Sequence, residues 1–252
     1  MKIILNLIVV MIIVLITSAC GDKTPPKIVK EPKTPDVMVI GNQTWAIKNL
    51  DLDAFRNGDT IPQAKTNKEW IAAGKNKQPA WCYRDNDPKN GTKYGKLYNW
   101  YAVNDARGLA PMGWHVPTDQ EWTVLSTFLG GEDIAGEKMK SSSGWNDYGC
   151  KKCNGGSAEF KKICSACKGT QSNSSEPFSC NGTNSSGFTG LPGGARNYDG
   201  SFDVVDNSGF WWSASESNET LAWYRALPNL NSNLYRNTVI NNFGFSVRCV
   251  RD

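Results

Sequence analysis

The segment GWHVPTDQEW, residues 113–122, contains the start of the helix that the sequence predicts most clearly. Thr118 and Glu121 stand three residues apart, which is the spacing of a capping box, where each side chain accepts a hydrogen bond from the other residue's backbone N–H. Apolar residues then recur on one face as far as Leu129, and two glycines follow as a stop signal. We therefore expect an amphipathic helix of about three turns whose apolar face packs into a core.

Short elements are predicted on both sides of this helix. Residues 37–47 have the pattern of two strands joined by a tight turn at Gly41-Asn42, because glycine and asparagine tolerate the positive φ that such turns need. A second capping box predicts a short helix over residues 66–73. Aromatic and β-branched runs, separated by Asn, Ser and Gly, predict an antiparallel sheet near the end of the chain; they cover residues 210–215, 221–227 and 245–250. The pattern predicts an α+β domain.

The first residues have the pattern of an export signal. Lys2 precedes an uncharged apolar run, residues 3–16, that is too short for an ordinary membrane-spanning helix but typical of a signal-peptide core. Small residues then lead up to Cys20, in a segment that resembles the lipobox of bacterial lipoproteins. We expect cleavage after residue 19 and attachment of a lipid to the sulfur of Cys20.

The segment after Cys20 is predicted to be a tether. Residues 20–36 contain four prolines and four lysines with almost nothing apolar to bury, which is typical of an extended, solvated spacer. Residues 37–252 then form the folded domain. Gly21 lacks the aspartate that retains some lipoproteins in the inner membrane, so we expect attachment to the outer membrane or the cell surface. The formal net charge of +4 over 252 residues gives no indication of a nucleic-acid partner.

Seven stretches follow one another in order over nearly the whole of this domain. They are IGNQTW (40–45) with NL (49–50), FRNGD (55–59), YGKLYNWYAV (94–103), GWHVPTDQEW (113–122), GFTGLPGG (187–194), WWSASE (211–216) and GFSVRCVR (244–251). Together they resemble the Fibrobacter succinogenes major paralogous domain, a family of exported proteins. That family is similar in turn to the formylglycine-generating-enzyme branch of the C-type lectin-like fold. The resemblance implies a C-type lectin-like α+β domain with short helices, an antiparallel sheet and little regular structure.

The resemblance does not imply an enzymatic activity. Formylglycine-generating enzymes use a reactive cysteine pair that binds copper, whereas residues 211–216 contain no cysteine and Cys249 matches a structural position. His115 is the only histidine, and it lies in a turn that enters a helix, with no nucleophile motif such as G-x-S-x-G in the sequence. We expect a non-catalytic binding or structural domain. The alternative is a degenerate or unrecognised enzyme of the same fold.

Aromatic residues are the candidate ligand-binding residues. Two adjacent pairs, Trp211-Trp212 and Trp223-Tyr224, lie in the predicted sheet, where the alternation of a strand turns one member of each pair to the outer face. Exposed rings of this kind can stack on sugars, so a glycan is one candidate ligand and a partner protein is the other. The competing interpretation is that these rings fill the core, because folds with little regular structure pack around tryptophan.

Four cysteines form the most specific local motif. Cys150, Cys153, Cys164 and Cys167 have the spacing C-x2-C-x10-C-x2-C and lie in a polar insertion of about residues 146–185. Two such turns can place four thiolates around one structural zinc ion. Export to an oxidising compartment favours disulfides instead, and the sequence leaves both open.

Three further cysteines remain once Cys20 carries lipid. Of these we expect Cys82 and Cys249 to form a disulfide and Cys180 to be free or a substitute partner. The resembling family often has a cysteine before Pro-x-Gly-Trp-His, but Ala110 stands there, so that alternative partner of Cys249 is absent.

Overall fold

The computed structural model describes residues 35–146 and 181–252. Cys20, the predicted signal peptide and nearly all of the predicted tether and insertion lie outside these ranges. The described residues form short helices and antiparallel strands, which confirms the α+β class. None of the helices in the described part of the chain has the length and apolarity to cross a membrane.

Both predicted capping boxes are present. Helix α4 (Asp119–Phe128) begins after Thr118, whose side chain accepts from the backbone N–H of Glu121, while Glu121 accepts from the backbone of Thr118. Helix α1 (Asn67–Lys75) has the same arrangement with Thr66 and Glu69. The other helical segments are α2 (Gly91–Tyr94), α3 (Trp100–Val103), α5 (Glu132–Met139) and two 3-10 turns, η1 (Arg84–Asn86) and η2 (Pro88–Asn90).

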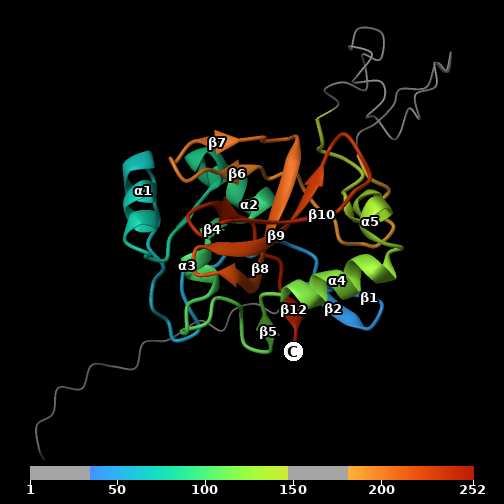
Figure 1. Ribbon diagram of the computed structural model, residues 1–252, viewed down its shortest axis with the longest axis horizontal. Coiled ribbons are helices and arrows are strands. Elements are labelled where there is room, and N and C mark those ends of the chain that lie inside the picture. Colours follow the sequence, from blue (N-terminus) through green and yellow to red (C-terminus); the bar gives the residue numbers. More distant parts are fainter. Residues whose placement is uncertain (1–34, 147–180) are drawn as a thin grey trace, which may run out of the picture. The chain divides into compact units, whose positions relative to one another are not determined.

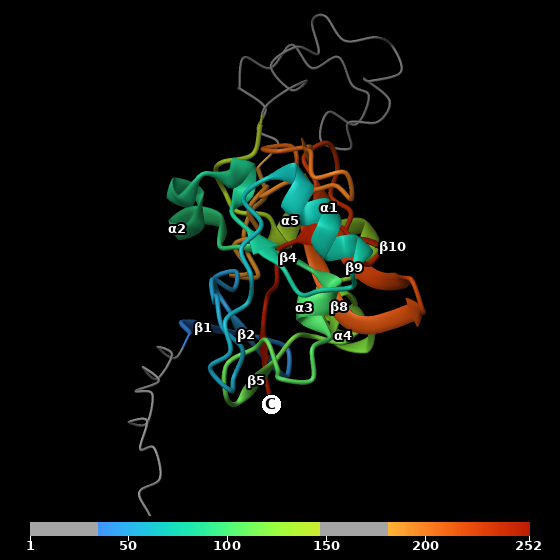
Figure 2. The same cartoon turned by 90° about the vertical axis from the view of Figure 1, so that its left-hand side faces the viewer.

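The predicted N-terminal hairpin opens the first sheet. Strands β1 (Val37–Ile40) and β2 (Gln43–Ala46) pair around Gly41, which has φ of 62°. The order of this sheet is β1-β2-β12-β5, with β12 (Val250–Arg251) between β2 and β5 (Trp114–His115). The first and last strands of the described chain therefore meet in one sheet, and both views place this sheet at the end of the domain where the C-terminus lies (Figures 1 and 2).

Two more sheets complete the domain. The three-stranded sheet has the order β10-β9-β8, formed by β8 (Ser208–Asn218), β9 (Leu221–Pro228) and β10 (Tyr235–Ile240). In Figure 1 it crosses the middle of the domain, with α4 and α5 on one side and α1 on the other. The third sheet has the order β3-β4-β11-β6-β7 and very short strands: β3 (Trp81–Cys82), β4 (Leu97–Asn99), β6 (Ala195–Arg196), β7 (Phe202–Asp203) and β11 (Gly244–Phe245).

The predicted continuous strand over residues 245–250 is wrong. The chain pairs with β4 in β11, leaves that sheet, and pairs with β2 and β5 only in β12. Between the two strands Arg248 is buried, and its guanidinium donates to the backbone carbonyls of Ala46, Ile47 and Phe188. These hydrogen bonds compensate the burial of its charge and tie the crossover to the N-terminal hairpin.

Two aromatic clusters fill the core, one on each side of the three-stranded sheet. Trp45, Trp122, Phe188 and Trp211 belong to the cluster beneath α4, where the ring centroids of Trp45 and Trp122 are 4.8 Å apart. The other cluster contains Tyr98, Trp100, Trp114, Trp212 and Phe245. The tryptophans in these clusters are at most 6% exposed. Burial of such large rings supplies most of the packing in a domain whose strands are so short.

Candidate functional site

The sheet register assigns each candidate ring to a face. Residues that stand opposite one another on neighbouring strands point to the same face, and successive residues alternate. The face toward α4, which we call the α4 face, contains Trp211, Trp223, Arg225, Arg236 and Thr238. The opposite face, which we call the shelf face, contains Phe210, Trp212, Ala222, Tyr224, Ala226, Tyr235, Asn237 and Val239.

Trp211 and Trp212 are not exposed, so their prediction as ligand-binding residues is wrong. Alternation does send the two rings to opposite faces, but a core cluster covers each face at β8. Trp211 packs against Phe188 with ring centroids 5.6 Å apart, and Trp212 packs against Phe245 at 4.6 Å. Both tryptophans have no exposed surface. They hold the sheet between its two covering layers.

Trp223 is half-buried, and an arginine occupies one face of its ring. The guanidinium of Arg236 lies 3.6 Å from the ring centroid, within the range of a cation–π contact. Arg236 also donates to the carboxylate of Asp119, the first residue of α4. A ring covered in this way offers little surface for stacking on a ligand.

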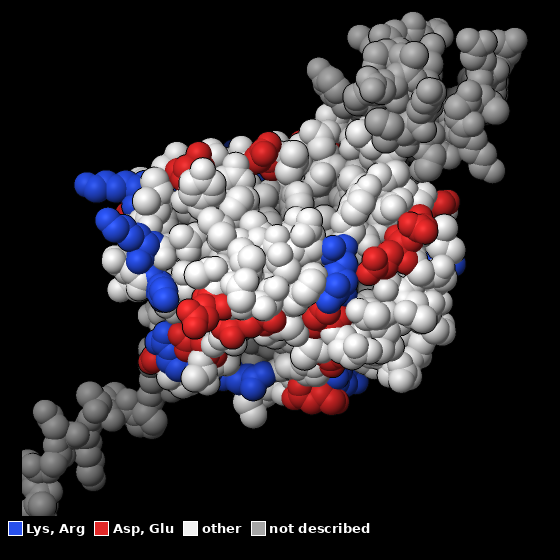
Figure 3. Space-filling view, in the orientation of Figure 1, with Lys and Arg blue, Asp and Glu red and all other residues white. Residues whose placement is uncertain are grey.

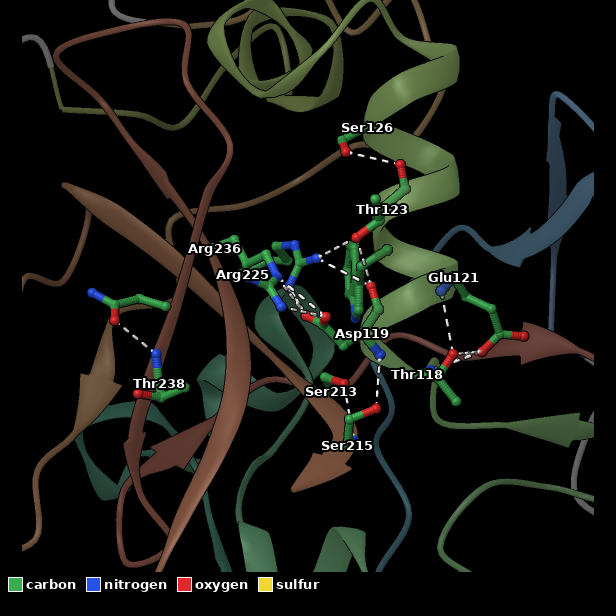
Figure 4. Close-up of polar contacts among 12 residues, drawn as sticks. Thr118, Asp119, Glu121, Thr123, Ser126, Ser213, Ser215, Arg225, Arg236 and Thr238 are labelled. Carbon is green, nitrogen blue, oxygen red and sulfur yellow. Dashed lines mark hydrogen bonds and ion pairs between the residues drawn. The ribbon is translucent and has the colours of Figure 1, made fainter. Parts of the chain in front are cut away.

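Asp119 connects this arginine to a second, buried one (Figure 4). The Arg225 side chain has no exposed surface, and its Nη1 lies 2.7 Å from Asp119 Oδ1. Its Nη2 donates to the backbone carbonyl of Asp119 and to Thr123 Oγ1. Partial burial alone would raise the pKa of Asp119, but the hydrogen bonds from Arg236 and Arg225 outweigh it and lower the pKa. The network fastens α4 to the sheet.

Tyr224 belongs to a connected group of rings that we call the aromatic shelf: Tyr198, Phe210, Tyr224, Phe243 and Phe245. Phe245 is buried, and its ring centroid lies 5.0 Å from Phe210, 5.0 Å from Tyr224 and 5.8 Å from Phe243. Tyr198 extends the group through Phe243, at 6.0 Å. Tyr198 is 57% exposed, and Phe210, Tyr224 and Phe243 are each half-buried. The shelf is a set of accessible rings, three of which pack on the buried ring of Phe245 while Tyr198 packs on Phe243.

Sequence reasoning found only one member of this shelf, Tyr224. Phe210 begins the predicted run 210–215 and Phe243 stands just before the run 245–250, yet nothing in the local pattern marks either ring as accessible. Tyr198 lies in the turn between β6 and β7, and only tertiary packing brings it to Phe243. Accessibility here depends on which segments cover a strand, and alternation alone does not give that information.

Charged side chains are scarce along the shelf face. Arg225 of β9 and Arg236 of β10 point to the α4 face. Among the paired residues of this sheet, only Glu216, opposite Ala222 at the far end of β8, places a charged side chain on the shelf face. Figure 3 shows a broad area without Lys, Arg, Asp or Glu in the middle of one side of the domain, around the position of β9 in Figure 1, with charged residues at its margins. The arrangement suits an uncharged ligand.

The only histidine is held between two carboxylates. His115 Nε2 lies 2.7 Å from Glu121 Oε1, and His115 Nδ1 lies 2.7 Å from Asp252 Oδ1. Partial burial would lower the pKa of His115, but the hydrogen bonds to Asp252 and Glu121 outweigh it and raise the pKa. Both ring nitrogens are thus engaged in joining β12 to the start of α4, which leaves neither free to take a proton from a substrate.

The predicted Cys82–Cys249 disulfide is wrong, because both thiols are free. Cys82 packs in a small cluster with Trp70 and Leu97, whereas Cys249 packs in the larger cluster with Trp212 and Phe245. Burial raises the pKa of Cys82 to about 11 and the pKa of Cys249 to about 12. Thiols in such surroundings stay protonated, so they are packing residues and not nucleophiles.

The predicted metal or disulfide residues Cys150, Cys153, Cys164 and Cys167 lie outside the described residues, as does Cys180. Within the described ranges no group of three or more His, Cys, Asp or Glu side chains is placed to hold a metal ion. The two ends of the insertion meet at hydrogen bonds: the backbone N–H of Trp145 donates to Asn181 Oδ1 at 3.0 Å, and that of Gly182 donates to the Ser141 carbonyl at 3.0 Å. The chain therefore leaves and re-enters the domain at neighbouring points.

Comparison with known proteins gives one match. A family model described as the Fibrobacter succinogenes major domain covers residues 38–251. No curated protein and no solved structure matches the chain significantly. The matched range runs from within β1 to the end of β12 and includes the residues of the aromatic shelf.

Proposed function

The chain belongs to the Fibrobacter succinogenes major domain family, and we propose that it is an exported lipoprotein whose folded domain binds a ligand at the aromatic shelf without catalysing a reaction. The observation that carries the proposal is the shelf itself. Three accessible rings contact one buried ring and a fourth, Tyr198, joins them through Phe243, beside a sheet face that is nearly free of charge. Contiguous accessible rings of this kind are typical of recognition surfaces.

The other reactive side chains support binding over catalysis. The one histidine has both ring nitrogens engaged with carboxylates, and Cys82 and Cys249 are buried thiols with raised pKa values. Asp119 binds the arginines that hold α4 on the sheet, and Glu121 caps the start of α4. Each of these groups has a structural task that explains its position.

The lipid anchor rests on the sequence. An apolar run after Lys2 and small residues before Cys20 support cleavage and lipidation, and residues 20–36 supply a proline- and lysine-rich spacer. A single cysteine-linked lipid group would bring the domain to a membrane while leaving it in water. We place the protein at the outer membrane or the cell surface, and we further propose a C-type lectin-like arrangement for the domain.

The insertion of about residues 146–185 is proposed to be a structural module. Its four cysteines have the spacing of a zinc site, and the alternative is that they form two disulfide bonds. The hydrogen bonds at Trp145 and Gly182 support this proposal, because they close the base of the insertion within the main domain.

Metabolic labelling tests the anchor. Cells producing the wild-type protein, Cys20→Ala or Cys82→Ala are grown with radioactive palmitate and then fractionated. We expect label and membrane association for the wild type and for Cys82→Ala, which removes a buried thiol of the domain. Cys20→Ala should remain an unlabelled, unprocessed precursor, because the lipid acceptor is gone. Persistent label in Cys20→Ala would contradict the anchor.

A further inference from the structure

We propose that the aromatic shelf binds a neutral carbohydrate. This inference rests on the proposed function, since it names the ligand class of the same surface. Sugar rings have an apolar face of C–H groups that packs on aromatic rings, and hydroxyls around the edge that need hydrogen-bonding partners. The shelf and the groups next to it supply both features without a charged side chain among the rings.

The rings are held in place before any ligand arrives. Phe245 contacts Phe210, Tyr224 and Phe243 from below, and Phe245 and Phe210 stack with an interplanar angle of 16°. Phe245 itself packs on the fully buried Trp212, with ring centroids 4.6 Å apart. Because the supporting rings are buried, a ligand that stacks on the accessible rings loses little side-chain entropy from the protein.

Polar groups without partners stand beside the accessible rings. Asn237 lies directly opposite Tyr224 on the neighbouring strand and is exposed, so its side chain stands on the shelf face. Its Oδ1 accepts from the backbone N–H of Thr238, while its amide N–H groups have no partner among the described residues. The hydroxyls of Tyr198 and Tyr224 also lack a hydrogen-bond partner within the described ranges. Amide and hydroxyl groups of this kind can donate to or accept from sugar hydroxyls.

The charge distribution selects a neutral ligand. An acidic sugar would gain most from an arginine or lysine at the binding surface. Arg225 and Arg236 instead point to the α4 face and are engaged with Asp119. Glu216 at the far end of the face would repel a negative charge.

A carbohydrate fits this surface better than a partner protein does. A stable protein interface covers about 800 Å² on each partner and is enriched in arginine around large apolar anchors. The shelf offers four partly accessible rings with interleaved amide and hydroxyl groups, and its neighbouring arginines are turned to the other face. That composition suits an oligosaccharide.

An oligosaccharide array followed by calorimetric titration tests the inference. Full-length protein, purified in detergent, is applied to neutral, sialylated and sulfated oligosaccharides, and the neutral one retained best is then titrated. Tyr198→Ala removes the most exposed ring of the shelf, and Phe128→Ala removes a 63% exposed ring on α4 as the matched control. We expect Tyr198→Ala to raise the Kd about tenfold, or about 1.4 kcal/mol. Phe128→Ala should leave the Kd within about twofold, as is usual for remote surface changes.

The possible outcomes distinguish failure of the carbohydrate inference from failure of the proposed function. Retention of no neutral oligosaccharide, preference for acidic ones, or equal Kd values for Tyr198→Ala and the wild type would each overturn the inference. A protein ligand whose binding is lost in Tyr198→Ala would also overturn it, while leaving the shelf as a binding surface. Palmitate labelling reports on the anchor alone, so its failure would contradict the proposed attachment and not the ligand.

Discussion

Both faces of the three-stranded sheet carry tryptophan and other aromatic residues, but the two faces differ in how far these rings are exposed to solvent. On the α4 face, Trp211 is buried under α4 and Trp223 lies under Arg236, so helix and arginines close the surface. On the shelf face, Trp212 is buried at β8, but Tyr224 and Phe210 keep part of their surface, and Phe243 and Tyr198 continue the accessible rings. The protein's own side chains cover the rings of the α4 face, whereas the rings of the shelf face remain accessible to a ligand.

This difference shows how structural and recognition roles can be told apart in one sheet. A ring that packs against a helix and carries a bonded arginine contributes to stability, and a ligand would have to displace these contacts to reach it. Rings supported from below and accessible from above contribute less to stability, because part of their area stays in water. Variants on the α4 face should therefore change the free energy of unfolding, and variants on the shelf should change binding.

The largest effect is expected when the α4 face loses its buried counter-ion. Asp119→Asn leaves the Arg225 guanidinium, whose side chain has no exposed surface, without its carboxylate. Breaking a buried pair in this way costs several kcal/mol, and because Asp119 is itself 18% exposed we expect about 2–3 kcal/mol less free energy of unfolding. Urea unfolding of the two proteins measures the difference.

The matched control removes the exposed arginine of the same network. Arg236→Gln leaves the Asp119–Arg225 pair in place, and the Arg236 side chain is 36% exposed, so a loss of no more than about 1 kcal/mol is expected. Equal losses for Asp119→Asn and Arg236→Gln would show that burial of Arg225 does not govern the stability of this face.

A smaller and pH-dependent effect is expected at His115, where β12 meets the start of α4. The pKa of His115 is raised in the folded protein, so its ion pairs contribute fully below the unfolded pKa of about 6.5 and are lost as pH rises through the folded pKa. Glu121 remains ionised at pH 5.5 because its pKa is lowered: burial would raise it, but hydrogen bonds from Thr118 and His115 prevail.

His115→Asn should therefore lower the free energy of unfolding more at pH 5.5 than at pH 8.5. The side chain of His115 is 35% exposed, so solvent screening limits the difference between the two pH values to about 1 kcal/mol or less. Phe128→Ala removes no titratable group and serves as the control, with the same loss at both pH values. A larger loss for His115→Asn at pH 8.5 would contradict the charged state assigned to the histidine.

Local patterns predicted helices α1 and α4 and the N-terminal hairpin because their signals lie within a few residues. The Thr118–Glu121 and Thr66–Glu69 boxes and the Gly41 turn form as expected. Contacts between segments that are far apart in the sequence could not be predicted in this way. Alternation separated Trp211 from Trp212 but did not reveal that both faces are covered at β8.

Two further predictions failed for the same reason. Counting cysteines paired Cys82 with Cys249, yet the two thiols belong to different clusters, and a count contains no distances. A continuous strand over residues 245–250 matched the apolar pattern. Arg248, however, donates to the carbonyls of Ala46 and Ile47, about 200 residues earlier, and to that of Phe188, and the chain changes sheets there. Tyr198 had no local signal, since only packing on Phe243 makes it part of the shelf.

Hydroxyl-radical footprinting tests most directly the claim that the shelf face, and not the α4 face, is the binding surface. The protein is oxidised with and without a saturating neutral oligosaccharide, and modification of each ring is measured by mass spectrometry. We expect the ligand to protect Tyr198, Phe210, Tyr224 and Phe243, while Trp223 on the α4 face and Phe128 on α4 react as before. Protection of Trp223 with no change at Tyr198 and Tyr224 would contradict the account.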